Sequence, residues 1–98
     1  MRIGFHPDAN EEFRAASAYY NNEVPGLGEG FISEVERIAE LIQAHPTIGQ
    51  PVDEVFRRAI LVRFPYSIIY CIEIDRLWVI AVAHQRRRPG YWRGRIDR

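Results

Sequence analysis

The sequence predicts an α+β protein in which two helices pack on one face of a mostly antiparallel sheet. Two consecutive amphipathic helix patterns fill the N-terminal half of the chain. Three runs rich in β-branched and aromatic residues follow, at residues 56–62, 66–74 and 77–83. Only short polar or proline-containing breaks separate these runs, so we expect a C-terminal three-stranded meander. A short apolar segment at residues 2–5 is expected to add an N-terminal edge strand.

The chain has 98 residues, enough for one domain over residues 1–98. Its hydrophobic share of 47% and charged share of 27% are typical of a globular protein rather than a disordered one. The sequence has neither an apolar run of about 18 residues nor an apolar signal segment, so we expect a cytoplasmic protein without a membrane partner. Cys71 is the single cysteine and lies in an apolar run, which predicts a buried free thiol.

The first helix is expected over residues 9–21. Asp8 and Glu11 have the spacing of a capping box, which predicts Asp8 as the N-cap. The apolar face of this helix consists of residues at helical spacing: Ala9, Phe13, Ala16 and Tyr20. Pro25 and Gly26 break the pattern before the second helix, so we expect a helical hairpin.

The second helix is expected over residues 27–45, because Pro46 disfavours helix in the residue before it. One apolar stripe runs along it: Leu27, Phe31, Val35, Ile38 and Ile42. Its acidic residues are expected on the exposed surface: Glu29, Glu34, Glu36 and Glu40. Residues 47–53, which include Gly49 and Pro51, are expected to form the loop that leads to the sheet.

Alternation along the strands sorts their side chains into two faces. In the middle strand it groups one set: Tyr66, Ile68, Tyr70, Ile72 and Ile74. In the last strand it groups another: Trp78, Ile80, Val82 and His84. Both faces are apolar, so alternation leaves open which of them faces the helices. In the C-terminal tail, Tyr91 and Trp92 are expected to fold back over the edge of the sheet.

The net charge of zero hides an asymmetry along the chain. Residues 1–56 contain three Arg and ten acidic residues, whereas residues 57–98 contain ten Arg and three acidic residues. All thirteen basic residues are Arg, which is the better donor for bidentate contacts to phosphate and carboxylate. The asymmetry predicts a bipolar surface whose basic side meets an anionic partner, unless the two halves attract each other instead.

An antiparallel meander brings the turn at Arg63 and the residues after Ala83 to the same end of the sheet. We therefore expect a target-binding or nucleic-acid-binding cluster there, made by seven arginines: Arg57, Arg58, Arg63, Arg86, Arg87, Arg88 and Arg93. Arginines interleaved with aromatic residues such as Tyr66 and Tyr91 suit nucleic acid or an acidic protein. His84 is either a general acid–base group or a hydrogen-bonded strand end. The alternative for the run Arg86 to Arg88 is that these charges only solvate the end of the strand and bind no partner.

No motif for a nucleotide loop, a nucleophilic serine or a zinc site is present. The three histidines, His6, His45 and His84, belong to different predicted elements and are far apart in sequence. We therefore expect neither a metal site nor a cofactor.

Four segments carry a resemblance to a known family: His45-Pro46 with Gly49, the segment Arg63 to Tyr66, the strand Ser67 to Ile72, and Ala81 to Trp92. In this order and spacing they resemble the RelE/ParE toxin superfamily of bacterial type II toxin–antitoxin systems. The resemblance covers nearly the whole chain. It implies a small α+β plasmid-stabilisation toxin that a cognate antitoxin protein holds inactive.

The superfamily divides by target, and the resemblance leans toward its ParE branch. ParE-like members inhibit DNA gyrase, whereas RelE-like members cut mRNA in the ribosome. The pattern of His84 and Arg86 after the last strand resembles the ParE branch, and Gln85 and the missing lysines depart from the RelE branch. A RelE-like enzyme would have four catalytic residues: Arg63, His84, Arg86 and Tyr91. Gyrase inhibition is thus the expected function, with an endonuclease and a non-toxic binding module as alternatives and the oligomeric state open.

Overall fold

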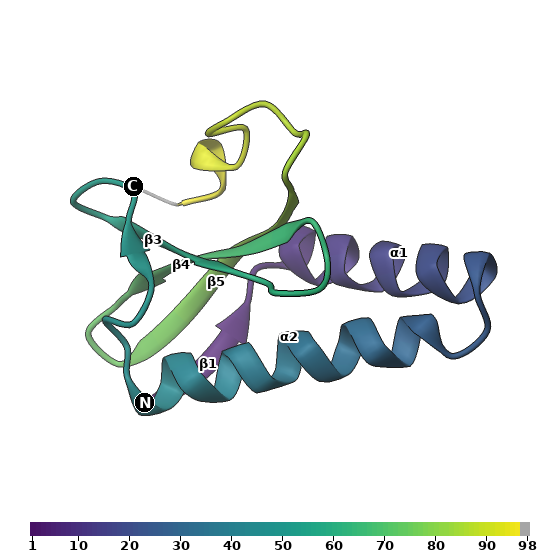
Figure 1. Ribbon diagram of the computed structural model, residues 1–98. Coiled ribbons are helices and arrows are strands. Elements are labelled where there is room, and N and C mark those ends of the chain that lie inside the picture. Colours follow the sequence, from purple (N-terminus) through teal and green to yellow (C-terminus); the bar gives the residue numbers. More distant parts are fainter. Residues whose placement is uncertain (97–98) are drawn as a thin grey trace.

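The computed structural model describes residues 1–96, and Figure 1 shows their arrangement. The elements follow one another as β1 (Arg2–Phe5), α1 (Pro7–Glu23), α2 (Leu27–Ala44), β2 (Gln50–Pro51), β3 (Phe56–Ile60), β4 (Tyr66–Ile72) and β5 (Arg76–His84). A short 3-10 helix at Arg93–Arg95 lies in the tail. The short strand β2 falls inside the segment that we expected to be a loop.

The five strands form one sheet in the order β1-β5-β4-β3-β2. Strands β3, β4 and β5 are the expected antiparallel meander. Strand β1 forms one edge and pairs parallel with β5, and β2 forms the other edge and pairs antiparallel with β3. The predicted α+β class, with an N-terminal strand and a helical hairpin on a mostly antiparallel sheet, is confirmed.

Helix α1 begins two residues earlier than expected, and its N-cap is His6 rather than Asp8. The Nδ1 atom of His6 accepts a hydrogen bond from the backbone N–H of Asp8 at 3.0 Å. Pro7 occupies the first turn, where its fixed φ suits the helix and its missing N–H has no partner to lose. The capping-box prediction was wrong because proline favours the first position of a helix, so the helix starts at Pro7 and not after Asp8.

The sheet has an apolar core on each face. For this reason neither face of the predicted strands was polar in the sequence. The face toward α1 and α2 contains Phe31, Val35, Ile42, Ile68, Tyr70, Val79 and Val82, among others. The opposite face contains Phe56, Ile69, Cys71, Ile80, Ala81 and Ala83, and the tail covers it with Trp92 (Figure 1). The Trp92 ring lies 4.6 Å from the Phe56 ring, so the tail packs on this face rather than only along an edge.

A β-bulge in β5 breaks the alternation expected for that strand. Ile69 pairs with Ala81 and Tyr70 pairs with Val79, so Ile80 has no partner in β4. Ile80 and Ala81 therefore both belong to the core under the tail. Val82 moves to the helix side, and the prediction that placed it with Ile80 was wrong.

Candidate functional site: the basic end of the sheet

Backbone pairing brings the turn between β3 and β4 next to the end of β5. Tyr66 pairs with His84, and the backbone N–H of Gln85 donates to the carbonyl of Pro65 at 2.8 Å. Arg63 in the turn and the run Arg86 to Arg88 after β5 are therefore at the same end of the sheet. What the arginine side chains do there differs from one residue to the next.

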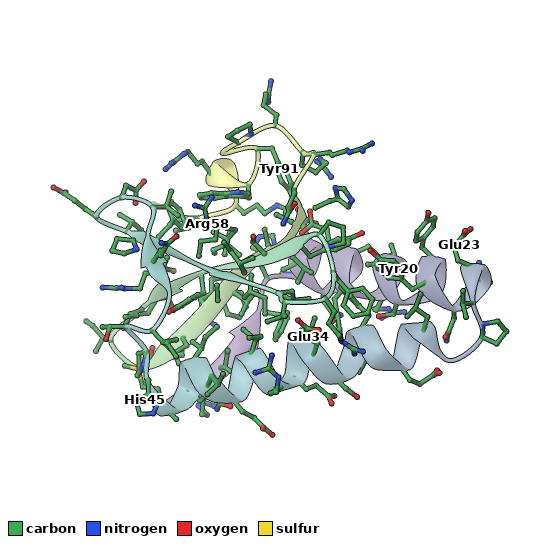
Figure 2. All side chains as sticks on the ribbon, in the orientation of Figure 1. Tyr20, Glu23, Glu34, His45, Arg58 and Tyr91 are labelled. Atoms are coloured by element: carbon green, nitrogen blue, oxygen red, sulfur yellow. The ribbon has the colours of Figure 1, made fainter. Side chains whose placement is uncertain are left out.

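Arg63 is held by α2. Its Nε lies 3.3 Å from Oε1 of Glu34, and its guanidinium also donates to the carbonyl of Gly30 at 3.5 Å. The Glu34 side chain is 4% exposed, so the expectation that it lies on the exposed surface was wrong. Burial raises the pKa of Glu34, but hydrogen bonds from Arg63 and Val62 outweigh it, and the net pKa is lowered. Figure 2 shows Glu34 on the side of α2 that faces the sheet.

Two glutamates, one from each helix, accept hydrogen bonds from backbone N–H groups of the sheet and of its β3–β4 turn. Glu34 accepts the backbone N–H of Val62 just after β3, and that of Arg63 at 3.1 Å. Glu12 of α1 accepts the backbone N–H of Val82 in β5 at 3.0 Å, beyond the end of β1. Both carboxylates thus satisfy backbone donors, in the β3–β4 turn and in β5, that no neighbouring strand reaches.

Glu12 also anchors the tail. Its Oε2 accepts a hydrogen bond from the Tyr91 hydroxyl at 2.6 Å and from the Arg95 guanidinium at 2.9 Å. Arg95 also donates to the carbonyl of Ile80 at 3.0 Å, next to the bulge. Burial and the bond to Glu12 raise the pKa of Tyr91, and the bond to Glu12 raises the pKa of Arg95. The Tyr91 hydroxyl is therefore a neutral donor that is engaged with α1.

The side chains of Arg57 and Arg93 bind residues of the segment between α2 and β3. Arg57 donates to the carbonyl oxygens of Thr47 at 3.1 Å and Gly49 at 2.7 Å. Arg93 lies 2.5 Å from Oδ2 of Asp53, and this bond lowers the pKa of Asp53 to about 2. Both arginines thus have intramolecular partners that hold the segment between α2 and β3.

Tyr70 holds the loop after α2 through two hydrogen bonds. This loop contains His45, Pro46 and Gly49. The Tyr70 hydroxyl donates to the carbonyl of Pro46 at 2.6 Å and accepts the N–H of Gly49 at 3.0 Å. A Cβ at Gly49 would lie 2.7 Å from that hydroxyl, so the close approach requires glycine. This part of the family resemblance therefore has a structural reason.

Three arginines, Arg58, Arg86 and Arg88, are exposed and have no ion pair within residues 1–96. Arg87 stacks on the Tyr91 ring, with 3.8 Å between the guanidinium carbon and the ring centroid. Arg58, Arg87 and Arg88 border a pocket of about 280 Å³ between the uncovered part of the sheet and the tail, and Arg86 lies outside its lining. Figure 2 shows Arg58 on the sheet side of this space and Tyr91 on the tail side.

His84 closes the strand end. Its Nδ1 accepts the backbone N–H of Arg86 at 3.0 Å, and its ring lies edge-on to Tyr66 at 5.0 Å. His84 and Tyr91 border the same pocket, whereas Arg63 borders a separate hollow beside Glu34. Among residues 1–96, the four positions of a RelE-like catalytic site therefore do not share one pocket. The same part of the chain has no group of three or more His, Cys, Asp or Glu side chains placed to hold a metal ion.

Glu12 and Glu34 are the residues that sequence reasoning missed. Each lies at helical spacing between apolar residues of its own helix: Glu12 between Ala9 and Ala16, and Glu34 between Phe31 and Ile38. An acidic residue inside an apolar stripe is the signal that could have identified them, because a buried carboxylate requires a partner.

The helical hairpin on one sheet face and the basic tail on the other define a small α+β protein with RelE/ParE topology. A model of the family described as ParE toxin of type II toxin-antitoxin system, parDE, matches residues 3–89, so the chain belongs to this family. The chain also resembles a solved structure of the chromosomal ParDE TA system from P. aeruginosa, at 14% identity and a TM-score of 0.75. That match covers 86% of this chain and 95% of the other and concerns the fold. None of the curated proteins matches the sequence. No helix within residues 1–96 combines the length and apolarity that a bilayer crossing demands.

Proposed function

We propose that this chain is the toxin of a type II toxin–antitoxin pair and that it inhibits DNA gyrase. The observation that carries the proposal is the ParE family match over residues 3–89. The similar solved structure is described as a ParDE system, which supports a cognate antitoxin as the partner of this chain. Binding of that antitoxin would keep the toxin inactive.

The contact surface for the target is the basic end of the sheet. Arg58, Arg86 and Arg88 are exposed there without ion pairs in the described part of the chain, so their charges are available to an anionic partner. Arginine charges on such a surface speed encounter with a negatively charged target and orient it.

An endonuclease is less well supported by the geometry. Cleavage of RNA requires an acid, a base and charge stabilisation around one phosphate. The Tyr91 hydroxyl donates to Glu12, and Arg63 binds Glu34 and borders a separate hollow. These intramolecular bonds favour inhibition of the target by binding over cleavage of RNA.

The test combines growth and supercoiling. Induced expression should arrest bacterial growth, and the purified chain should inhibit supercoiling by gyrase. The double substitution Arg86→Gln and Arg88→Gln should weaken inhibition about tenfold or more, because each charged contact contributes about 1.5–3 kcal/mol. Arg14→Gln with Arg37→Gln removes the same charge from the exposed helix surfaces and serves as the control.

Three outcomes would redirect the assignment. Full supercoiling with folded, antitoxin-free protein would exclude gyrase as the target. Codon-linked cleavage of mRNA in a translating extract would establish the endonuclease instead. Harmless overexpression of folded protein in the source host would indicate a binding module without toxicity.

A further inference from the structure

The pocket between the tail and the sheet has a mixed lining. Its floor is the tail-facing side of β4 and β5, at Ser67, Ile69 and Ala83, which are all buried. Arg58 of β3 borders it on one side, and the tail borders it on the other. The tail contributes Gln85 and the residues from Arg87 to Arg93. The cavity thus combines an apolar base with a strongly basic rim.

Among residues 1–96, no acidic side chain lines this pocket. Its charged residues are four arginines: Arg58, Arg87, Arg88 and Arg93. Arg93 is neutralised by Asp53 at 2.5 Å. Arg87 stacks on the Tyr91 ring, which leaves the guanidinium N–H groups in its plane available as donors. Arg58 and Arg88 have no carboxylate partner within residues 1–96. Three cations therefore surround one cavity, and no carboxylate of the described residues pairs with them.

From this arrangement we infer that the pocket binds the phosphate group of a single nucleotide unit. Guanidinium groups pair with phosphate oxygens through two parallel hydrogen bonds. The volume of about 280 Å³ is at the lower end of small-molecule sites, so it admits one nucleotide and excludes a helix or a duplex. The apolar floor at Ile69 and Ala83 accommodates the less polar part of a nucleotide. A carboxylate side chain bound to the same arginines would leave this floor empty.

This inference shares Arg58 and Arg88 with the proposed contact surface for the target, but it does not require that the target be gyrase. It concerns what the pocket holds, and direct binding tests it without any enzyme assay. The nucleotide unit comes either from a free nucleoside phosphate or from the backbone of a single strand, and both present the same phosphate chemistry.

The experiment is a nuclear magnetic resonance titration of the full chain at about 0.15 M salt, where the Debye length is about 8 Å. The probes are AMP, a thymidine tetranucleotide, adenosine and a peptide of four glutamates. AMP should shift the backbone amides of Ile69, Ala83 and Gly90 in a saturable way, because these residues line the pocket. A tetranucleotide that binds more tightly than AMP would identify a strand as the source, and equal affinities would identify a single nucleotide as sufficient.

Substitutions test the same residues. The double variant Arg58→Gln and Arg88→Gln should weaken AMP binding about tenfold or more, since two charge-assisted contacts are lost. Both side chains are exposed, so the variant should fold, and thermal unfolding checks this. Arg14→Gln with Arg37→Gln is the matched control and should change the affinity by less than about twofold, as is expected of surface charges distant from the ligand.

Several results would overturn the inference. Adenosine binding as tightly as AMP would show that phosphate is not recognised. A glutamate peptide that binds the pocket while AMP does not would assign the site to an acidic protein. Equal AMP affinities of the wild type and the folded Arg58 and Arg88 variant, or shifts centred outside the pocket, would likewise exclude it.

Discussion

The Tyr91 hydroxyl donates a 2.6 Å hydrogen bond to the carboxylate of Glu12, so the first helix holds the C-terminal tail on the sheet. The two residues are 79 positions apart in the sequence. The same carboxylate binds Arg95 and the backbone of Val82. One side chain therefore joins the helix layer, the sheet edge and the tail.

Replacing Glu12 should loosen this junction. The Glu12→Gln substitution removes the charge that binds Arg95, and both side chains are largely buried, at 17% and 16% exposed. We expect the free energy of unfolding to fall by about 2–3 kcal/mol, since a buried pair that loses one partner leaves the other unsatisfied. Urea unfolding measures the change. Glu11→Gln, on the exposed neighbour, should change stability by less than about 0.5 kcal/mol. Equal effects of the two substitutions would contradict the anchoring role.

Tyr91→Phe separates the two branches of the superfamily. The substitution keeps the ring on which Arg87 stacks and removes the bond to Glu12, so it should lower stability by about 1 kcal/mol. Growth arrest on expression should persist below the melting temperature, because inhibition by binding does not need the hydroxyl. Loss of growth arrest in a variant that is still folded would instead indicate chemistry at this hydroxyl.

Glu34 should make stability depend on pH in the acidic range. Its pKa is lowered in the folded protein, so the unfolded chain binds the proton more tightly. The stabilisation is fully present above the pKa of an unfolded Glu, about 4.3, and is lost as the pH falls through the lower folded value. The difference in unfolding free energy between wild type and Glu34→Gln should therefore shrink from about pH 6 to about pH 3. Glu36→Gln, exposed on the same helix, should show no such trend, and a constant difference for Glu34→Gln would contradict the prediction.

Two glycine substitutions test the loop after α2. A Cβ at Gly49 would meet the Tyr70 hydroxyl at 2.7 Å, whereas a Cβ at Gly94 would meet nothing within 4 Å. Gly49→Ala should lower the free energy of unfolding by about 1–3 kcal/mol, because the loop must move from a packed position. Gly94→Ala should stay within about 0.5 kcal/mol. Thermal or urea unfolding compares the two, and a harmless Gly49→Ala would mean that the loop can shift without loss.

The sequence predicted the fold well because its signals are local. Apolar spacing located both helices, and β-branched runs located the three strands of the meander. The register within β5 was not predictable, because the bulge at Ile80 depends on pairing with β4 and leaves no mark in the alternation. The start of α1 was mispredicted because two local signals, the capping pattern at Asp8 and the proline at position 7, competed.

The candidate site was predictable in position but not in detail. The predicted strand order placed Arg63 and the run after Ala83 at one end of the sheet. In the structure, the pairing of Tyr66 with His84 brings these two segments together. The partners of individual arginines depend on side chains from distant elements, such as Glu34 for Arg63. These pairings decide which cations are still available, and spacing along the chain does not specify them.

The anchoring of the tail by α1 joins two segments that are made at different times during synthesis. The N-terminal helix and the meander emerge from the ribosome before Tyr91, Trp92 and Arg95. A product that terminates before Tyr91 would expose Phe56 and Ile80 to water and would lack one wall of the basic pocket. Such a product would leave the tail-facing core exposed and would lack part of the basic pocket, so the chain must extend through the tail to complete this face.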